Sequence, residues 1–159
     1  MKKYFYFLLL LFVAVSCTED IKFNNPAFQG LKDNVFWRAN AYTSYTRDGS
    51  FIISGQLGPD AVTFKLPSSA PGTYILGVDD IKTASYSNVF QDDNPKFSTG
   101  TKKGSGQIVI TDLDSENKTI SGTFKFTAIN NDATDLENPK ITFTEGVFYK
   151  IPITPTLEY

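Results

Sequence analysis

Residues 119–129 carry the feature that most constrains the fold, because their side chains alternate strictly between two kinds. Ile120, Phe124, Phe126 and Ala128 share one set of positions, while threonine, serine and lysine hold most of the other set. Successive side chains of a strand point to opposite faces, so this pattern predicts an antiparallel β-strand with one buried and one solvated face. We expect Phe124 and Phe126 to form the centre of a hydrophobic core, with Tyr74 and Trp37 close to it.

Further strand signals surround this segment. The alternating run 35–42 and the apolar run 51–53 flank Asp48-Gly49, which predicts a hairpin. Other strands are expected at 61–66, 73–78, 84–90, 107–111 and 141–151. After residue 16, no segment of the sequence combines helical periodicity with capping residues. The sequence therefore predicts an all-β domain of about eight to ten antiparallel strands, arranged as a β-sandwich, with a small lipocalin-like β-barrel as the alternative.

The N-terminal segment predicts a signal peptide over residues 1–16. Lys2 and Lys3 precede an almost wholly apolar run, 4–15, which is shorter than the roughly 20 residues of a membrane-spanning helix. Residues 17–34 then read as a lipidated N-terminus and polar tether, and residues 35–159 as a single all-β domain.

The sequence Ala-Val-Ser-Cys at 14–17 resembles the lipobox of bacterial lipoproteins, which implies that Cys17 is lipidated. Cys17 is the only cysteine of the chain, so no intrachain disulfide competes for it. Two or three acyl chains on this residue would anchor the protein firmly. The acidic pair Glu19-Asp20 resembles the surface-export signal of Bacteroidota lipoproteins, so we expect a lipid anchor in the outer membrane, on either its periplasmic or its surface face.

Composition excludes several chemistries. The chain has no histidine, which removes serine–histidine triads, histidine general bases and the common zinc sites. It also lacks a glycine-rich phosphate loop. Its 15 basic and 17 acidic residues form no basic stripe, which disfavours nucleic acid as a partner. We therefore expect no enzymatic activity, no cofactor and no metal.

Aromatic residues in or near the expected loops are the candidates for ligand binding: Tyr42, Tyr45, Tyr86 and Phe90. Their rings would stack on sugars or anchor a protein partner. The alternative for each is that it closes over the core.

A glycine precedes an aromatic residue by two positions at four places: Gly49, Gly72, Gly122 and Gly146. At each of them the missing side chain leaves room for a neighbouring ring.

Two acidic features have alternative interpretations. Asp112, Asp114 and Glu116 present spaced oxygen atoms, but without the fixed glycine and final glutamate of a calcium loop, so a solvated hairpin tip is favoured over a calcium site. Glu145 falls in phase with buried positions. A β-bulge at Glu145-Gly146 would turn it outward, and is favoured over a buried functional carboxylate.

Several motifs, taken in order, resemble a family of Bacteroidota lipoproteins classified as a domain of unknown function. They lie at 25–29, 36–39, 72–77, 106–108, 122–126 and 146–148. The resemblance implies a localisation and a fold, and it supplies no catalytic residues.

The expected function is a non-enzymatic binding or assembly module at the outer membrane, with a glycan or an envelope protein as partner. A carrier that holds a small apolar ligand inside a barrel is the alternative, and a calcium- or glycan-binding surface module is the third. A wide apolar cavity would favour the carrier, whereas a filled core would favour the binding module.

Overall fold

The computed structural model describes residues 25–88 and 96–155, and within these ranges it contains eleven β-strands and no helix. The strands are β1 Ala27–Lys32, β2 Val35–Arg38, β3 Ala41–Arg47, β4 Ser50–Leu57, β5 Asp60–Leu66, β6 Gly72–Leu76, β7 Thr83–Asn88, β8 Lys96–Ser98, β9 Ser105–Asp114, β10 Thr119–Asn130 and β11 Lys140–Pro152. The predicted all-β fold is confirmed. A helix long and apolar enough to span a bilayer does not occur in the described ranges.

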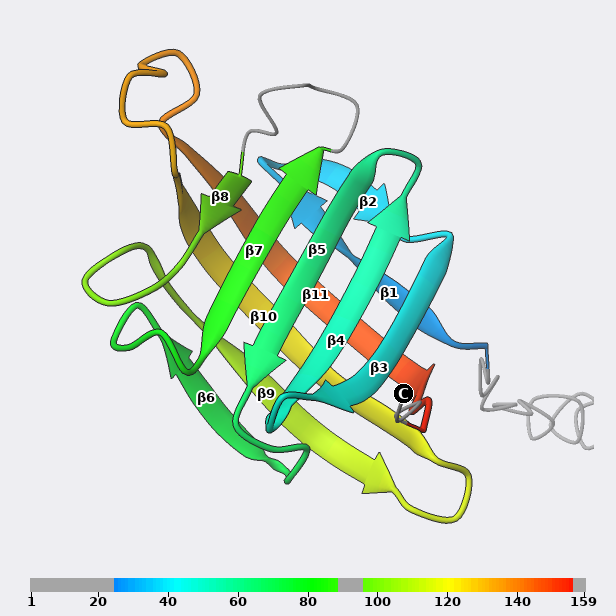
Figure 1. Ribbon diagram of the computed structural model, residues 1–159. Helices are drawn as coiled ribbons and strands as arrows, with labels where there is room; N and C mark the ends of the chain where they lie inside the picture. The colour runs from blue at the N-terminus through cyan, green and yellow to red at the C-terminus, as the bar shows by residue number, and fades with distance from the viewer. Residues whose placement is uncertain (1–24, 89–95, 156–159) are drawn as a thin grey trace, which may run out of the picture.

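All of these strands belong to one antiparallel sheet that curls into a half-barrel (Figure 1). The order along its main path is β2-β1-β11-β10-β8-β7-β5-β4-β3, and β9 pairs with both β10 and β6. The sheet has two walls: one contains β2, β1, β11, β10, β9 and β6, and the other contains β7, β5, β4 and β3. The short strand β8 joins them, because it pairs with β7 and with the end of β10. The walls thus pack face to face as in a sandwich, while their connection is that of a barrel-like sheet.

The expected strand 35–42 is divided between the two edges of this sheet. β2 ends at Arg38 and pairs with β1, whereas β3 begins at Ala41 and pairs with β4. Only two residues separate these strands, so the two edges of the curled sheet approach each other at this corner. At the other side of β3, Thr154 donates its backbone N–H to the Ser44 carbonyl oxygen at 2.7 Å, which ties β3 to the chain after β11.

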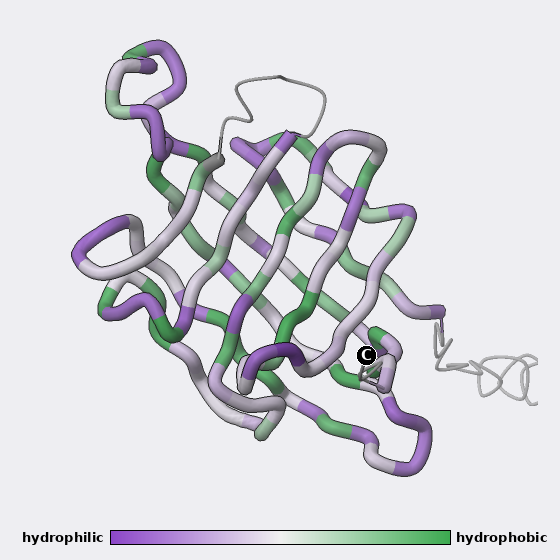
Figure 2. Tube along the Cα trace, in the orientation of Figure 1, coloured by the Kyte–Doolittle hydropathy of each residue, from purple (hydrophilic) through white to green (hydrophobic). Residues whose placement is uncertain are grey.

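Two predicted hairpins are confirmed. β3 and β4 pair directly around Asp48-Gly49, where φ is +50° and +72°, the left-handed pair typical of a type I′ turn. β9 and β10 pair from Asp114 and Thr119 onward. Figure 2 shows hydrophilic residues gathered at the β9–β10 turn and in the loop between β10 and β11.

The domain begins earlier than the predicted boundary at residue 35. Residues 27–32, expected in the tether, form β1, which lies between β2 and β11. Phe28 is completely buried. Pro26 and Gly30 weaken the strand pattern in the sequence, and it is the pairing with β2 and β11, together with the burial of Phe28, that makes this segment part of the sheet.

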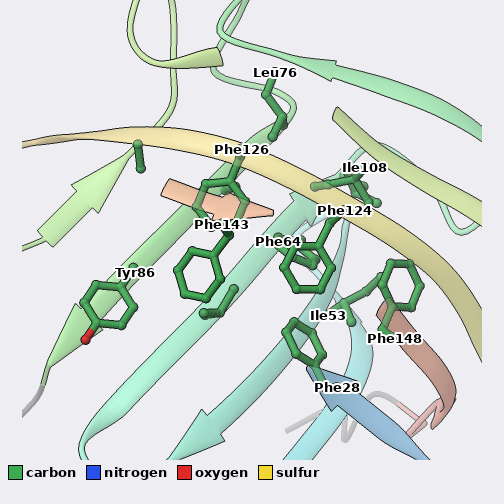
Figure 3. Close-up of a cluster of buried hydrophobic side chains, with 14 of the residues drawn as sticks. Phe28, Ile53, Phe64, Leu76, Tyr86, Ile108, Phe124, Phe126, Phe143 and Phe148 are labelled. Atoms are coloured by element: carbon green, nitrogen blue, oxygen red, sulfur yellow. The ribbon is translucent and has the colours of Figure 1, made fainter. Parts of the chain in front are cut away.

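Phenylalanine rings from both walls fill the space inside the half-barrel (Figure 3). We call this cluster the aromatic centre: Phe28, Phe64, Phe124, Phe126, Phe143 and Phe148. The Phe124 ring centroid on β10 lies 4.9 Å from that of Phe64 on β5 and 5.2 Å from that of Phe28 on β1. The predicted burial of Phe124 and Phe126 is confirmed, and Trp37 stands edge-on to Phe28 and Phe143. Tyr74 is only partly buried at the margin.

Glycines make room for these rings at three places. A Cβ on Gly146 would lie 2.4 Å from the Phe124 ring, and one on Gly122 would lie 2.3 Å from the Phe148 ring. A glycine of β11 therefore makes room for a ring of β10, and a glycine of β10 makes room for a ring of β11, as expected. Gly49 and Gly72 face open space instead. A third close approach, between Gly55 on β4 and Phe28, has no aromatic residue two positions later and was missed.

Glu145 is turned outward by a bulge. Phe124 lies opposite Gly146 and Phe126 opposite Phe143, so β11 has one residue more than β10 in this interval. Glu145 has a φ of +51° and is exposed. The bulge interpretation is confirmed, and Glu145 is no buried carboxylate.

Candidate functional site

The structure does not gather the candidate aromatic residues in one place. Tyr42 and Tyr45 lie three positions apart on β3, and alternation sends them to opposite faces. Tyr42 packs against the core and donates its hydroxyl to the Pro26 carbonyl oxygen at 3.3 Å. Tyr45 lines a shallow hollow of about 430 Å³ beside Arg47.

Tyr86 differs most from its expected position. It belongs to β7, is 5% exposed, and packs against Phe97 and Phe143, so it is no exposed loop residue. Figure 3 shows it at the margin of the ring cluster, with its hydroxyl directed away from the other rings. Phe90 and the lipidation candidate Cys17 lie outside the described residues.

The Tyr86 hydroxyl marks a polar pocket of about 240 Å³ at one end of the half-barrel, which we call the mouth pocket. It is formed where the β1–β2 turn, β7, β8 and the loop before β11 meet. Its lining residues are Lys32, Asp33, Tyr86, Asn88, Phe97, Asp135, Asn138, Lys140 and Ile141. Polar groups thus surround the opening, and buried core residues, Tyr86, Phe97 and Ile141, form the rest of its lining.

A chain of hydrogen bonds crosses the side of this pocket. The Lys32 ammonium donates to the Tyr86 hydroxyl oxygen at 3.1 Å and lies 4.8 Å from the centroid of the same ring. Asn88 donates its amide N–H to Asp60 at 3.1 Å. Burial, together with a hydrogen bond to the Asp60 carboxylate, raises the pKa of Tyr86 above its usual value. The phenol therefore stays protonated and accepts a hydrogen bond from Lys32.

The acidic residues of the mouth pocket are engaged in shaping its loops. Asp33 accepts a hydrogen bond from the Thr142 backbone N–H at 2.8 Å, which fixes the β1–β2 turn against β11. Asp135 accepts from the Asn138 backbone N–H and the Asn130 amide, each at 3.0 Å. In contrast, neither lysine of the pocket forms an ion pair with a carboxylate of the described residues.

Sequence reasoning missed Lys32 and Asp60 altogether. Lys32 ends a strand that was not expected, and Asp60 lies just before the strand expected at 61–66. The one available signal was the spacing of Tyr86 and Asn88, two positions apart on β7, which places both on one face.

The acidic hairpin tip has a structural explanation. Asp114 accepts hydrogen bonds from the Asn117 backbone N–H at 2.8 Å and from its side-chain amide at 2.7 Å. These bonds lower the pKa of Asp114 below its usual value. Among the residues that the structure describes, three or more metal-ligating side chains do not come together anywhere.

Comparison with curated proteins and with solved structures finds no match to this chain. A family model described as a domain of unknown function (DUF6252) matches residues 24–152. That interval includes every strand of the half-barrel and starts just before β1. The expected membership in a family of unknown function is confirmed, while the Bacteroidota lineage stays a prediction. The chain belongs to the DUF6252 family.

Proposed function

We propose that this protein is a lipoprotein of the outer membrane, anchored through Cys17, whose domain is a non-enzymatic binding or assembly module. The mouth pocket is its binding end. Support for the anchor comes from the sequence: Ser16-Cys17 directly follows an apolar run that is too short to span a bilayer.

The position of the mouth pocket relative to the tether carries the proposal. The chain enters the sheet at Ala27, the first residue of β1, where the Tyr42 hydroxyl bonds to Pro26. Lys32, at the other end of β1, lines the mouth pocket. A strand of this length separates the two points by roughly 17 Å, and they lie at opposite ends of β1 in Figure 1. A domain tethered from residue 25 would direct the pocket away from the bilayer, where a ligand has access to it.

The carrier alternative has less support. An apolar ligand would need a cavity between the walls, and the rings of the aromatic centre occupy that space at centroid separations of 4.9–6.4 Å. A calcium-binding hairpin also has less support, because Asp114 already accepts hydrogen bonds from Asn117.

Replacement of the anchor residue tests the proposal. We expect Cys17→Ala to abolish labelling with radioactive palmitate and to move the protein from the carbonate-washed membranes to the soluble fraction. Thr18→Ala is the matched control and should leave both unchanged. A Cys17→Ala protein that remains in the washed membranes would show that something other than a lipid on this cysteine holds the chain.

A further inference from the structure

We propose that the mouth pocket binds a sugar acid, a single pyranose ring bearing a carboxylate, and that the Lys32 ammonium pairs with that carboxylate. This inference deepens the proposed binding function and rests on it, but it does not depend on the lipid anchor.

The first argument is the state of Lys32. Its side chain is partly buried, and its ammonium group lies over the Tyr86 ring. An ammonium has three donors, and one of these bonds to the Tyr86 hydroxyl. No carboxylate of the described residues forms an ion pair with Lys32 or with Lys140, although both line the pocket. A partly desolvated cation without a counterion gains more from an anionic ligand than a fully solvated one does.

The second argument is that the pocket's own acids are already used. Both Asp135 oxygens accept hydrogen bonds from neighbouring amide groups, and Asp33 holds the Thr142 backbone N–H. Asp60, beside the pocket, accepts a hydrogen bond from the Asn88 amide. The acids of the pocket therefore already have hydrogen-bond donors from its loops. The Lys32 ammonium, in contrast, makes one hydrogen bond and has two further donors without an acceptor among the described residues, which favours a ligand that brings negatively charged acceptors.

The third argument concerns the shape of the ligand. A volume of about 240 Å³ suits one sugar ring and is too small for a long chain. The Asn138 side chain at the rim donates its amide N–H groups to Asp135, and its amide oxygen accepts no hydrogen bond from the described residues, so this oxygen can accept one from a ring hydroxyl group. Ile141 and Phe97 supply a narrow apolar wall against which the carbon face of a ring can lie.

Three small probes separate the contributions of charge and ring: glucuronate, glucose and acetate. Isothermal titration calorimetry on the full chain in detergent gives their affinities. We expect glucuronate to bind at least about tenfold more tightly than glucose, which lacks the carboxylate, and than acetate, which lacks the ring. Equal affinities for glucuronate and glucose, or no detectable binding of glucuronate at millimolar concentration, would overturn the inference.

Three lysine variants locate the site. Lys32→Met keeps the length of the side chain and should weaken glucuronate binding about tenfold, to the level of glucose. Lys140→Met, at an exposed position of the pocket lining, should weaken it less. Lys125→Met, on the outer face of β10, is the matched control and should bind as the wild type does. Unchanged binding by both pocket variants would place the ligand elsewhere.

Folding and anchoring are controlled separately. A thermal melt of each variant establishes that it is folded before titration, and Lys140→Met keeps the test decisive if Lys32→Met does not fold. The assay in detergent does not require an anchor. Failure of glucuronate to bind therefore contradicts this inference alone, whereas failure of the Cys17→Ala fractionation contradicts the proposed anchor.

Discussion

At the aromatic centre, the Phe124 ring fits against Gly146 and the Phe148 ring against Gly122, and this steric fit adds to the backbone pairing that holds the two strands in register. At the mouth pocket, the buried Tyr86 ring carries a hydroxyl that takes part in a chain of polar contacts with Lys32 and Asp60. The first region tolerates almost no change in volume, because interiors are packed as densely as organic crystals. The second region has open volume and two lysines that form no ion pair with the residues that the structure describes. Close packing specifies structure at the centre, whereas the mouth pocket leaves room for the ligand that we propose.

The largest expected effect is at the centre. Phe124→Ala removes a ring that is 3% exposed and touches both walls, so it should lower the free energy of unfolding by about 3–5 kcal/mol. Lys125→Ala, one residue away on the solvated face, should change it by less than about 0.5 kcal/mol. Urea denaturation measures both. Similar midpoints for the two variants would mean that the faces of β10 are misassigned.

A glycine substitution sharpens the claim that steric fit decides the centre. A Cβ on Gly55 would lie 2.7 Å from the Phe28 ring, so Gly55→Ala should cost about 1–3 kcal/mol by overpacking. In a Phe28→Leu background the same change should cost less, because the smaller side chain can move aside. A double-mutant cycle measures this coupling. Additive costs would contradict a direct clash between the two residues.

Tyr86→Phe tests the polar side of the comparison. The ring stays, but the Lys32 ammonium loses its acceptor, so the free energy of unfolding should fall by about 1–3 kcal/mol near neutral pH.

The same variant should alter the response to alkali. Because the pKa of Tyr86 is raised in the folded protein, the unfolded chain releases its proton first as pH rises above about 10. The wild type should therefore lose stability in this range, and its advantage over Tyr86→Phe should shrink. A constant difference from pH 8 to pH 11 in urea titrations would contradict the buried, protonated phenol.

The smallest effect is expected at the β9–β10 hairpin tip. Asp114→Ala removes the acceptor of the Asn117 hydrogen bonds and should lower the melting temperature slightly, whereas Asp112→Ala should not. The lowered pKa of Asp114 means that its contribution is present above its usual pKa near 4 and is lost as pH falls further. Added calcium should leave all three melting temperatures unchanged, and a rise confined to the wild type would instead assign a metal to this turn.

Parts of the fold with a local signal were predictable, and parts without one were not. β10 and its hairpin partner followed from alternation, and the Glu145 bulge followed from one charged residue in phase with buried positions. β1 and β8 were missed, because a six-residue strand containing Gly30 and a three-residue strand have too little pattern of their own. The candidate site was less predictable still: Tyr86 was named for exposure and is buried, and Lys32 was not named.

The sequence by itself determined the strand content, the solvated face of β10, the tight turn at Asp48-Gly49 and the absence of histidine chemistry. These depend on neighbours in the chain, on backbone preferences or on composition. Only the tertiary structure decided that β8 joins the walls into a curled sheet and that Phe28 packs against Gly55. It also decided that Lys32 meets Tyr86 across 54 positions of sequence. Contacts of that separation depend on how strands pair in space, and strand periodicity carries no information about the identity of the partner strand.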